Sequence, residues 1–175
     1  MQTIKALDDD QNIGNEDYDG GSSYGYSINS SGQVTGISSV DGTDHAFLYT
    51  PNKGSIKLAI GSSSTGYGIN DSGKVVGEFS VREFLGYNRI TETPGAFLYT
   101  PGKGMQDLKN LIDPSSGITL AAAYDINNAD QIVAQGTNGR AYLLSPTPEP
   151  EIYATMLIGL SLMALRRKKL SARKK

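Results

Sequence analysis

Hydrophobic and polar residues alternate over short stretches of this chain, and turn-forming residues separate the stretches. In segment 25–36, Tyr26 and Ile28 alternate with small or polar residues, as in a half-buried β-strand. Residues 29–32 then suit a tight turn, because asparagine is favoured at the first position of a β-turn and glycine at the fourth. The pattern predicts many short strands and no long helix in the first 146 residues.

The same pattern recurs, which makes this a repeat protein. Two elements each occur three times: the first at residues 25–36, 66–77 and 123–134, and the second at residues 45–51, 95–101 and 140–146. Each unit reads as four short strands, with the third repeat lacking the fourth. Residues 47–49 are apolar on both faces and should lie inside a sheet that is covered on both sides.

Repeats two and three depart from the first at a few places. The extra residues of repeat two, 81–94, fall between its second and third strands and are expected to form a surface loop. A fourth strand is expected from Gly104 towards Leu111. In repeat three, Asp130 replaces the turn glycine, and Asp tolerates the left-handed conformation better than most residues.

The predicted fold is all-β: blade-like antiparallel repeats in an incomplete propeller-like array, plus one C-terminal transmembrane helix. Propellers normally have four to eight blades; about two and a half are expected here, packed face to face without a closed ring, unless the chain is a fragment of a longer array. Segment 3–7 resembles segment 55–59 and could be a stray fourth strand. The predicted divisions are an N-terminal strand and acidic loop (1–23), repeats at 24–64, 65–121 and 122–146, and a sorting tail (147–175).

Charge is distributed unevenly along the 175 residues. Residues 1–150 hold nine Lys/Arg and 17 Asp/Glu, whereas residues 151–175 hold seven Lys/Arg and one Glu. A basic end of this kind usually contacts a membrane or nucleic acid, and the acidic body disfavours nucleic-acid binding by the folded part. No cysteine is present, so disulfides and thiolate metal sites are excluded.

The tail has three parts in a fixed order: a proline-rich linker, an apolar stretch at 152–165 and a basic end. This order predicts a single membrane span with a cytoplasmic C-terminus. A buried helix of the globular domain and a glycolipid-anchor signal are the alternatives. The residues assigned to the linker motif, the span and the basic stop are Pro148, Glu149 and Pro150; Ile152, Tyr153, Leu157, Leu160 and Leu165; and Arg166, Arg167, Lys168 and Lys169.

Two resemblances follow from these residues. The tail resembles a PEP-CTERM sorting signal, and segments such as His45-Ala46-Phe47 resemble the HAF repeat of extracellular proteins. The first resemblance implies export in a Gram-negative bacterium that makes exopolysaccharide, with recognition of the tail by an exosortase and final placement at the cell surface or in the matrix. Such proteins carry a signal peptide, and residues 1–10 show no apolar run, so we expect missing N-terminal sequence.

Candidate chemistry is sparse. His45 is the one histidine, so any Ser-His-Asp triad would have to use it, and no second imidazole exists for a zinc site. Its repeat equivalents are Gly95 and Arg140, which favours a structural role for His45. Residues 8–19 are acidic enough to attract calcium, but Ile13 stands where an EF-hand loop needs glycine. No cofactor is expected. Tyr49, Tyr99 and similar tyrosines could form a platform for sugar rings, or could simply pack in the sheets.

The sequence therefore predicts a non-enzymatic, exported β-repeat protein of the cell envelope or extracellular matrix, with a membrane and an exosortase-type enzyme as partners. The first alternative is a carbohydrate-binding module for exopolysaccharide. A secreted hydrolase fragment is a weaker alternative, because it would need two carboxylates in one cleft, whereas the acidic residues lie mainly in turns.

Overall fold

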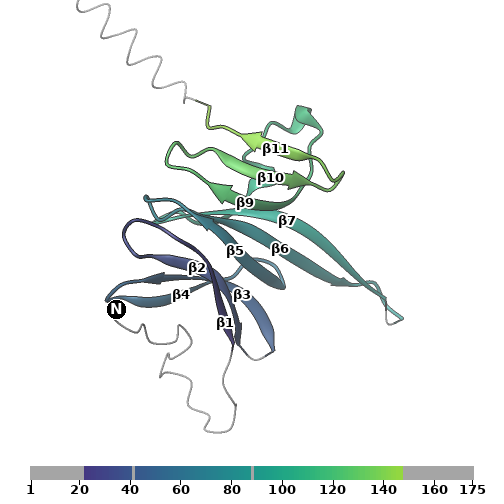
Figure 1. Ribbon diagram of the computed structural model, residues 1–175. Helices are drawn as coiled ribbons and strands as arrows, with labels where there is room; N and C mark the ends of the chain where they lie inside the picture. The colour runs from purple at the N-terminus through teal and green to yellow at the C-terminus, as the bar shows by residue number, and fades with distance from the viewer. Residues whose placement is uncertain (1–21, 41, 88, 148–175) are drawn as a thin grey trace, which may run out of the picture. The chain divides into compact units, whose positions relative to one another are not determined.

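Turn residues divide the chain into three antiparallel sheets (Figure 1). The structure, a computed structural model, describes residues 22–40, 42–87 and 89–147. Sheet 1 contains β1 (Ser23–Ile28), β2 (Val34–Val40), β3 (Thr43–Thr50) and β4 (Gly54–Leu58). Sheet 2 contains β5 (Ser63–Ile69), β6 (Val75–Phe84), β7 (Ile90–Thr100) and β8 (Gly104–Asp107). Sheet 3 contains β9 (Leu120–Ile126), β10 (Ile132–Gly136) and β11 (Ala141–Leu144). The all-β prediction is confirmed for these residues, and one sheet corresponds to each repeat.

The turn between the first two strands has the predicted residue preferences in all three sheets. Gly32 and Gly73 adopt φ values of 74° and 72°, and Asp130 takes the same left-handed conformation with φ 59°. The prediction that Asp130 stands in for the glycine is confirmed. The turn is therefore kept in repeat three without glycine.

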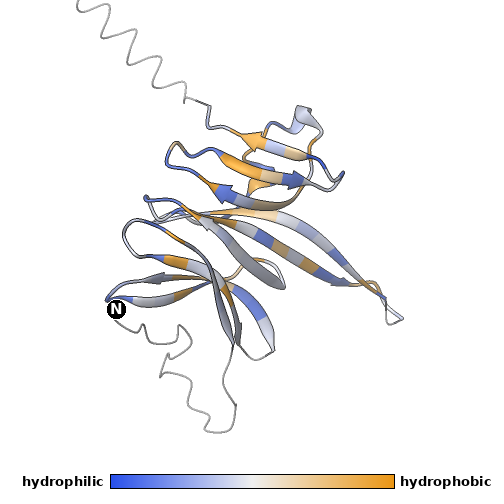
Figure 2. Cartoon of the chain, viewed as in Figure 1, coloured by the Kyte–Doolittle hydropathy of each residue, from blue (hydrophilic) through white to orange (hydrophobic). Residues whose placement is uncertain are grey.

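Apolar residues from adjacent sheets meet face to face and form two cores (Figure 2). Strand β5 contacts β1, β2 and β3 of sheet 1, and β9 contacts β5, β6 and β7 of sheet 2. The first core joins Ala46, Leu48 and Leu58 of sheet 1 to Ile69, Val75, Phe79 and Phe97 of sheet 2. The second joins Val76, Ala96 and Leu108 to Leu120, Ala123, Ile126, Ile132 and Ala134. Phe47 and Leu48 are 3% and 4% exposed, so β3 is buried on both faces as predicted.

The expected surface loop at 81–94 is instead a long hairpin. Pairing of β6 with β7 continues from Val75↔Tyr99 out to Phe84↔Ile90. The inserted residues include β-branched and aromatic side chains, which favour strands, so they extend the ladder as far as the pair Phe84↔Ile90. Phe84 and Tyr87 are exposed near the tip. The expected strand towards Leu111 is also shorter, since β8 ends at Asp107 and a 3-10 turn, η1 (Leu108–Asn110), follows.

The fold-class prediction is wrong in its transmembrane helix. No helix among the described residues is long and apolar enough to cross a membrane. The two helices described, η1 and η2 (Pro114–Ser116), have three residues each, about 6 Å of rise against a hydrocarbon core of about 30 Å. The expected span at 152–165 lies outside the described residues, as do segment 3–7 and the acidic segment 8–19.

Candidate functional site: a tyrosine row across the three sheets

One tyrosine occupies the same bulge in the first strand of every sheet. Tyr26 falls where the β1–β2 register shifts between Gly25 and Ser27, and Tyr67 falls where the β5–β6 register shifts between Gly66 and Gly68. In sheet 3 the partners step from Asp125↔Val133 to Ala123↔Ala134, which leaves Tyr124 as the extra residue. A bulge leaves its extra residue out of the regular pairing and re-aims the side chain. The repeated bulge therefore directs three equivalent tyrosines in the same way.

The three rings form a row. The ring centroids of Tyr26 and Tyr67 lie 5.8 Å apart with an interplanar angle of 38°, and those of Tyr67 and Tyr124 lie 5.4 Å apart at 37°. These distances are typical of favourable aromatic pairs. Tyr26 and Tyr124 keep 53% and 46% of their surface exposed, so the two outer rings are open to a ligand.

Small residues beside Tyr67 allow the first strands to approach closely enough for this row. A Cβ at Gly66 would lie 2.2 Å from Thr35 Oγ1 of sheet 1. A Cβ at Gly68 would lie 2.7 Å from the Asp125 Cα of sheet 3. Any larger residue at either position would push β5 away from a neighbouring sheet. The glycines on both sides of Tyr67 thus set the spacing between the rings.

Polar groups of the second strands border the row. The Tyr67 hydroxyl donates to Glu78 Oε1 at 2.7 Å, and the Tyr124 hydroxyl donates to Gln135 Oε1 at 3.0 Å. Ile37 occupies the equivalent position in sheet 1 and offers no acceptor. Burial raises the pKa of Tyr67, and the hydrogen bond to Glu78 and the charge of that carboxylate raise it further. The site therefore combines apolar ring surface with a carboxylate, an amide and hydroxyl groups.

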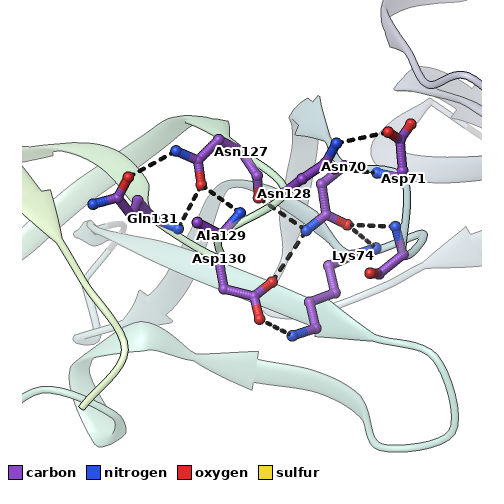
Figure 3. Close-up of polar contacts among 9 residues, drawn as sticks. Asn70, Asp71, Lys74, Asn127, Asn128, Ala129, Asp130 and Gln131 are labelled. Atoms are coloured by element: carbon purple, nitrogen blue, oxygen red, sulfur yellow. Dashed lines mark hydrogen bonds and ion pairs between the residues drawn. The ribbon is translucent and has the colours of Figure 1, made fainter. Parts of the chain in front are cut away.

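A second line of equivalent residues lies three positions after the tyrosines and joins the sheets through hydrogen bonds. Figure 3 shows the part of this line that joins sheets 2 and 3. The side chains of Asn29, Asn70 and Asn127 each accept two backbone N–H groups of their own turn, at 2.9–3.1 Å. Asn29 Nδ2 donates across to the Asn70 carbonyl oxygen at 3.0 Å, and Asn70 Nδ2 donates to the Asn127 carbonyl oxygen at 3.1 Å. We call these three residues the asparagine ladder. Because aspartate cannot donate, the ladder requires the amide in its first two members.

The residue after each ladder asparagine adds a parallel set of contacts. Asp71 Oδ1 accepts from the Ser30 backbone N–H at 2.9 Å and from its hydroxyl at 2.6 Å. Asn128 Nδ2 donates to Asp71 Oδ2 at 2.7 Å, and the Asp71 N–H donates to Asn128 Oδ1 at 2.9 Å. These hydrogen bonds hold the pKa of Asp71 below its usual value. Lys74 Nζ and Asp130 Oδ2, 2.6 Å apart, form an ion pair between sheets 2 and 3.

The two tyrosines named in the sequence analysis as a possible sugar platform are not part of the tyrosine row. Tyr49 and Tyr99 are partly buried on β3 and β7, and Tyr99 packs against the core between sheets 1 and 2. They do not line the row. Sequence reasoning missed Tyr26, Tyr67 and Tyr124 as a group, although their identical place in the three copies was a signal that could have found them.

His45 is a buried side chain of β3 rather than part of a cluster of functional groups among the described residues. It lies in β3, is 9% exposed, and its Nδ1 atom makes no hydrogen bond. Burial lowers the pKa of His45, Lys57 lowers it further, and Asp44 opposes both. No group of three or more potential metal-ligating His, Cys, Asp or Glu side chains occurs in the part of the chain that the structure describes.

The predicted sorting residues fall outside the described residues. They are Pro148, Glu149 and Pro150 of the linker, the apolar residues from Ile152 to Leu165, and the basic residues from Arg166 to Lys169. Comparisons with protein-family models, curated proteins and solved structures give no match to this chain. The resemblances to PEP-CTERM signals and HAF repeats therefore stay predictions.

Proposed function

We propose that this protein is a non-catalytic binding module whose tyrosine row holds a neutral glycan chain. The observation that carries the proposal is the row itself: three equivalent tyrosines, at equivalent bulges, with hydrogen-bonding side chains at two of them. Aromatic rings bind the apolar faces of sugar rings, and carboxylate and amide groups bind their hydroxyl groups. A repeated row suits a repeated ligand.

Charge favours a neutral glycan over an anionic one. Glu78 places a carboxylate beside the central ring, and residues 1–150 carry an excess of eight negative charges. An anionic polysaccharide would be repelled by this field. The ligand class we propose is therefore a linear, uncharged oligosaccharide.

Calorimetric titration of the full chain with a linear β-linked glucose hexamer tests this function. We expect binding, and we expect Tyr26→Ala and Tyr124→Ala each to weaken it about five- to tenfold, from the loss of about 1 kcal/mol per ring contact. Tyr87→Ala, in the β6–β7 hairpin, is the matched control and should bind like the parent. Absence of binding to this hexamer and to other neutral hexamers, or an equal loss in the Tyr87 variant, would overturn the proposal.

A structural role in the envelope or matrix is the second candidate, and the asparagine ladder favours it. Cross-sheet hydrogen bonds that repeat from unit to unit suit a spacer built from many such units. If none of the neutral glycans bound in the titrations, the structural role would be the remaining candidate. Export and sorting of the tail by an exosortase belong to either candidate and rest on the sequence pattern alone. Cleavage of a reporter fused to residues 146–175 in an exosortase-containing cell tests them.

A further inference from the structure

Among the described residues, each of the two outer sheets exposes apolar side chains whose equivalents are buried elsewhere in the same chain. On one face, residues Ile69, Val75 and Tyr99 of sheet 2 lie directly opposite one another and pack towards sheet 1. Their equivalents in sheet 3 are Ile126, Ile132 and Leu144, which pack towards sheet 2. In sheet 1 the equivalents are Ile28, Val34 and Tyr49.

Among the described residues, this first face is least covered at the isoleucine of sheet 1, while Val34 and Tyr49 are half-buried and Phe47 on the same face is buried. Ile69 and Ile126 are 6% and 4% exposed, whereas Ile28 is 65% exposed. We call the face of sheet 1 that carries Ile28, Val34 and Tyr49 the leading face. Its counterparts in sheets 2 and 3 show that a β-sheet is the partner this arrangement of side chains fits.

On the opposite face, the equivalent residues are buried in sheets 1 and 2 and exposed in sheet 3. Thr35 with Leu48, and Val76 with Leu98, are cross-strand pairs that pack towards the following sheet, and Thr35 and Val76 are fully buried. The equivalent pair in sheet 3 is Val133 and Leu143, which are 46% and 63% exposed. We call the face of sheet 3 that carries this pair the trailing face. Figure 2 shows hydrophobic colour along β10 and β11, the strands that bear it.

The asparagine ladder has open ends that match these faces. Asn70 Nδ2 donates both to a carbonyl of the following sheet and to Asp130, whereas Asn127 Nδ2 donates only to Gln131 of its own turn among the described residues. At the other end, the carbonyl of Asn29 accepts the N–H of Gly32, while the equivalent carbonyls of Asn70 and Asn127 also accept a side-chain amide of the preceding sheet. Among the described residues, Asn127 at the trailing face thus donates one hydrogen bond fewer than Asn70, and the Asn29 carbonyl at the leading face accepts one fewer than its equivalents.

We propose that the trailing face of one copy of this chain binds the leading face of a second copy, head to tail, as an additional repeat interface. Val133 and Leu143 would pack against Ile28 and Val34, and Asn127 would donate to the Asn29 carbonyl oxygen of the other copy. Two copies joined through both pairs of faces would present six sheets, which is within the range of closed propellers. The tyrosine row would then run on from Tyr124 of one copy to Tyr26 of the next.

Sedimentation equilibrium of the full chain tests the proposal. We expect a two-chain species for the parent, and a single chain for Ile28→Lys and for the double variant Val133→Lys/Leu143→Lys. All of these positions are exposed in the single chain, so circular dichroism should show the parental fold. Phe84→Lys, at the exposed hairpin tip, is the control and should retain the two-chain species.

A mixing experiment identifies the head-to-tail geometry. Ile28→Lys retains its trailing face and the double variant retains its leading face, so an equal mixture should form a one-to-one complex although neither associates alone. A parent that stays a single chain, association that survives both sets of substitutions, loss of association in Phe84→Lys, or failure of the mixture to pair would each overturn the proposal.

Discussion

The asparagine ladder and the tyrosine row cross the same three sheets only three residues apart, yet they are suited to different tasks. In the ladder, Asn70 is 3% exposed and its amide and carbonyl groups are all used within the molecule. In the row, the outer rings are about half exposed, and sheet 1 has Ile37 at the position where the other two sheets have a hydrogen-bond acceptor. Repetition alone therefore does not distinguish a structural residue from a binding residue. What distinguishes them is how much bonding capacity the fold leaves unused.

The largest effect should come from breaking the ladder at its centre. Asn70→Asp removes the donor to the Asn127 carbonyl and places a second carboxylate beside Asp130, which now accepts from Asn70 Nδ2 at 3.1 Å. We expect the free energy of unfolding to fall by about 3 kcal/mol. Urea denaturation measures it.

Asn138→Asp is the control for that variant. Asn138 also caps a turn, with its Oδ1 accepting from the Arg140 N–H, but its bonds stay within sheet 3. Its loss should be much smaller. Equal losses in the two variants would contradict a special role for contacts between sheets.

Substitutions in the tyrosine row should cost little stability and much glycan affinity. Tyr26→Ala and Tyr124→Ala are expected to lower the free energy of unfolding by about 1 kcal/mol each, because each loses one aromatic pair at a half-exposed position. The same variants should lose most of the glycan affinity. Paired denaturation and calorimetry on each variant make the comparison, and a stability loss as large as that of Asn70→Asp would mark the row as structural.

A smaller effect concerns the ionisation of the central ring. Burial contributes most to the raised pKa of Tyr67, Glu78 contributes next through its hydrogen bond and charge, and Tyr124 and Tyr26 contribute less. Glu78→Gln should therefore lower the pKa of Tyr67 without bringing it fully to the ordinary value near 10. Absorbance titration of the tyrosines against Tyr67→Phe isolates this group. The same shift in Glu83→Gln, an exposed carboxylate of β6, would argue against a direct contact.

The smallest effect lies outside both lines, at His45. Because burial lowers its pKa in the folded state, the unfolded chain takes up a proton first as pH falls. Stability should therefore decrease from about pH 6.5 downwards, through the folded pKa, and this part of the decrease should vanish in His45→Gln. Urea midpoints at about pH 7.5 and pH 5.5 measure it. An unchanged pH dependence in the variant would show that His45 does not titrate differently on folding.

Much of the fold could be predicted from local sequence patterns, but the contacts between repeats could not. Alternation and turn residues were sufficient for the strands and for the left-handed Asp130, because both depend on neighbouring residues. The segment at 81–94 was predicted as a loop because insertions in repeat proteins map to loops, a rule that takes no account of the β-branched and aromatic residues within it.

The site could not be read from the sequence in the same way. A row of rings depends on a bulge that places Tyr67 off the regular pairing, and on two flanking glycines that let neighbouring sheets approach. Hydrophobic periodicity in the sequence predicts strands, but it reveals neither the bulge nor the close approach of the sheets. The three equivalent tyrosines were visible, but their approach to within 6 Å needed the packing of the sheets.

Fluorine NMR of the full chain carrying fluorotyrosine tests the claim about the row most directly. The chain has ten tyrosines, and single Tyr→Phe substitutions assign their resonances. On titration with the neutral glucose hexamer, we expect the resonances of Tyr26, Tyr67 and Tyr124 to shift together and saturate, while those of Tyr49 and Tyr87 stay in place. A saturable shift confined to tyrosines outside the row, or no shift at any of the ten, would contradict that claim.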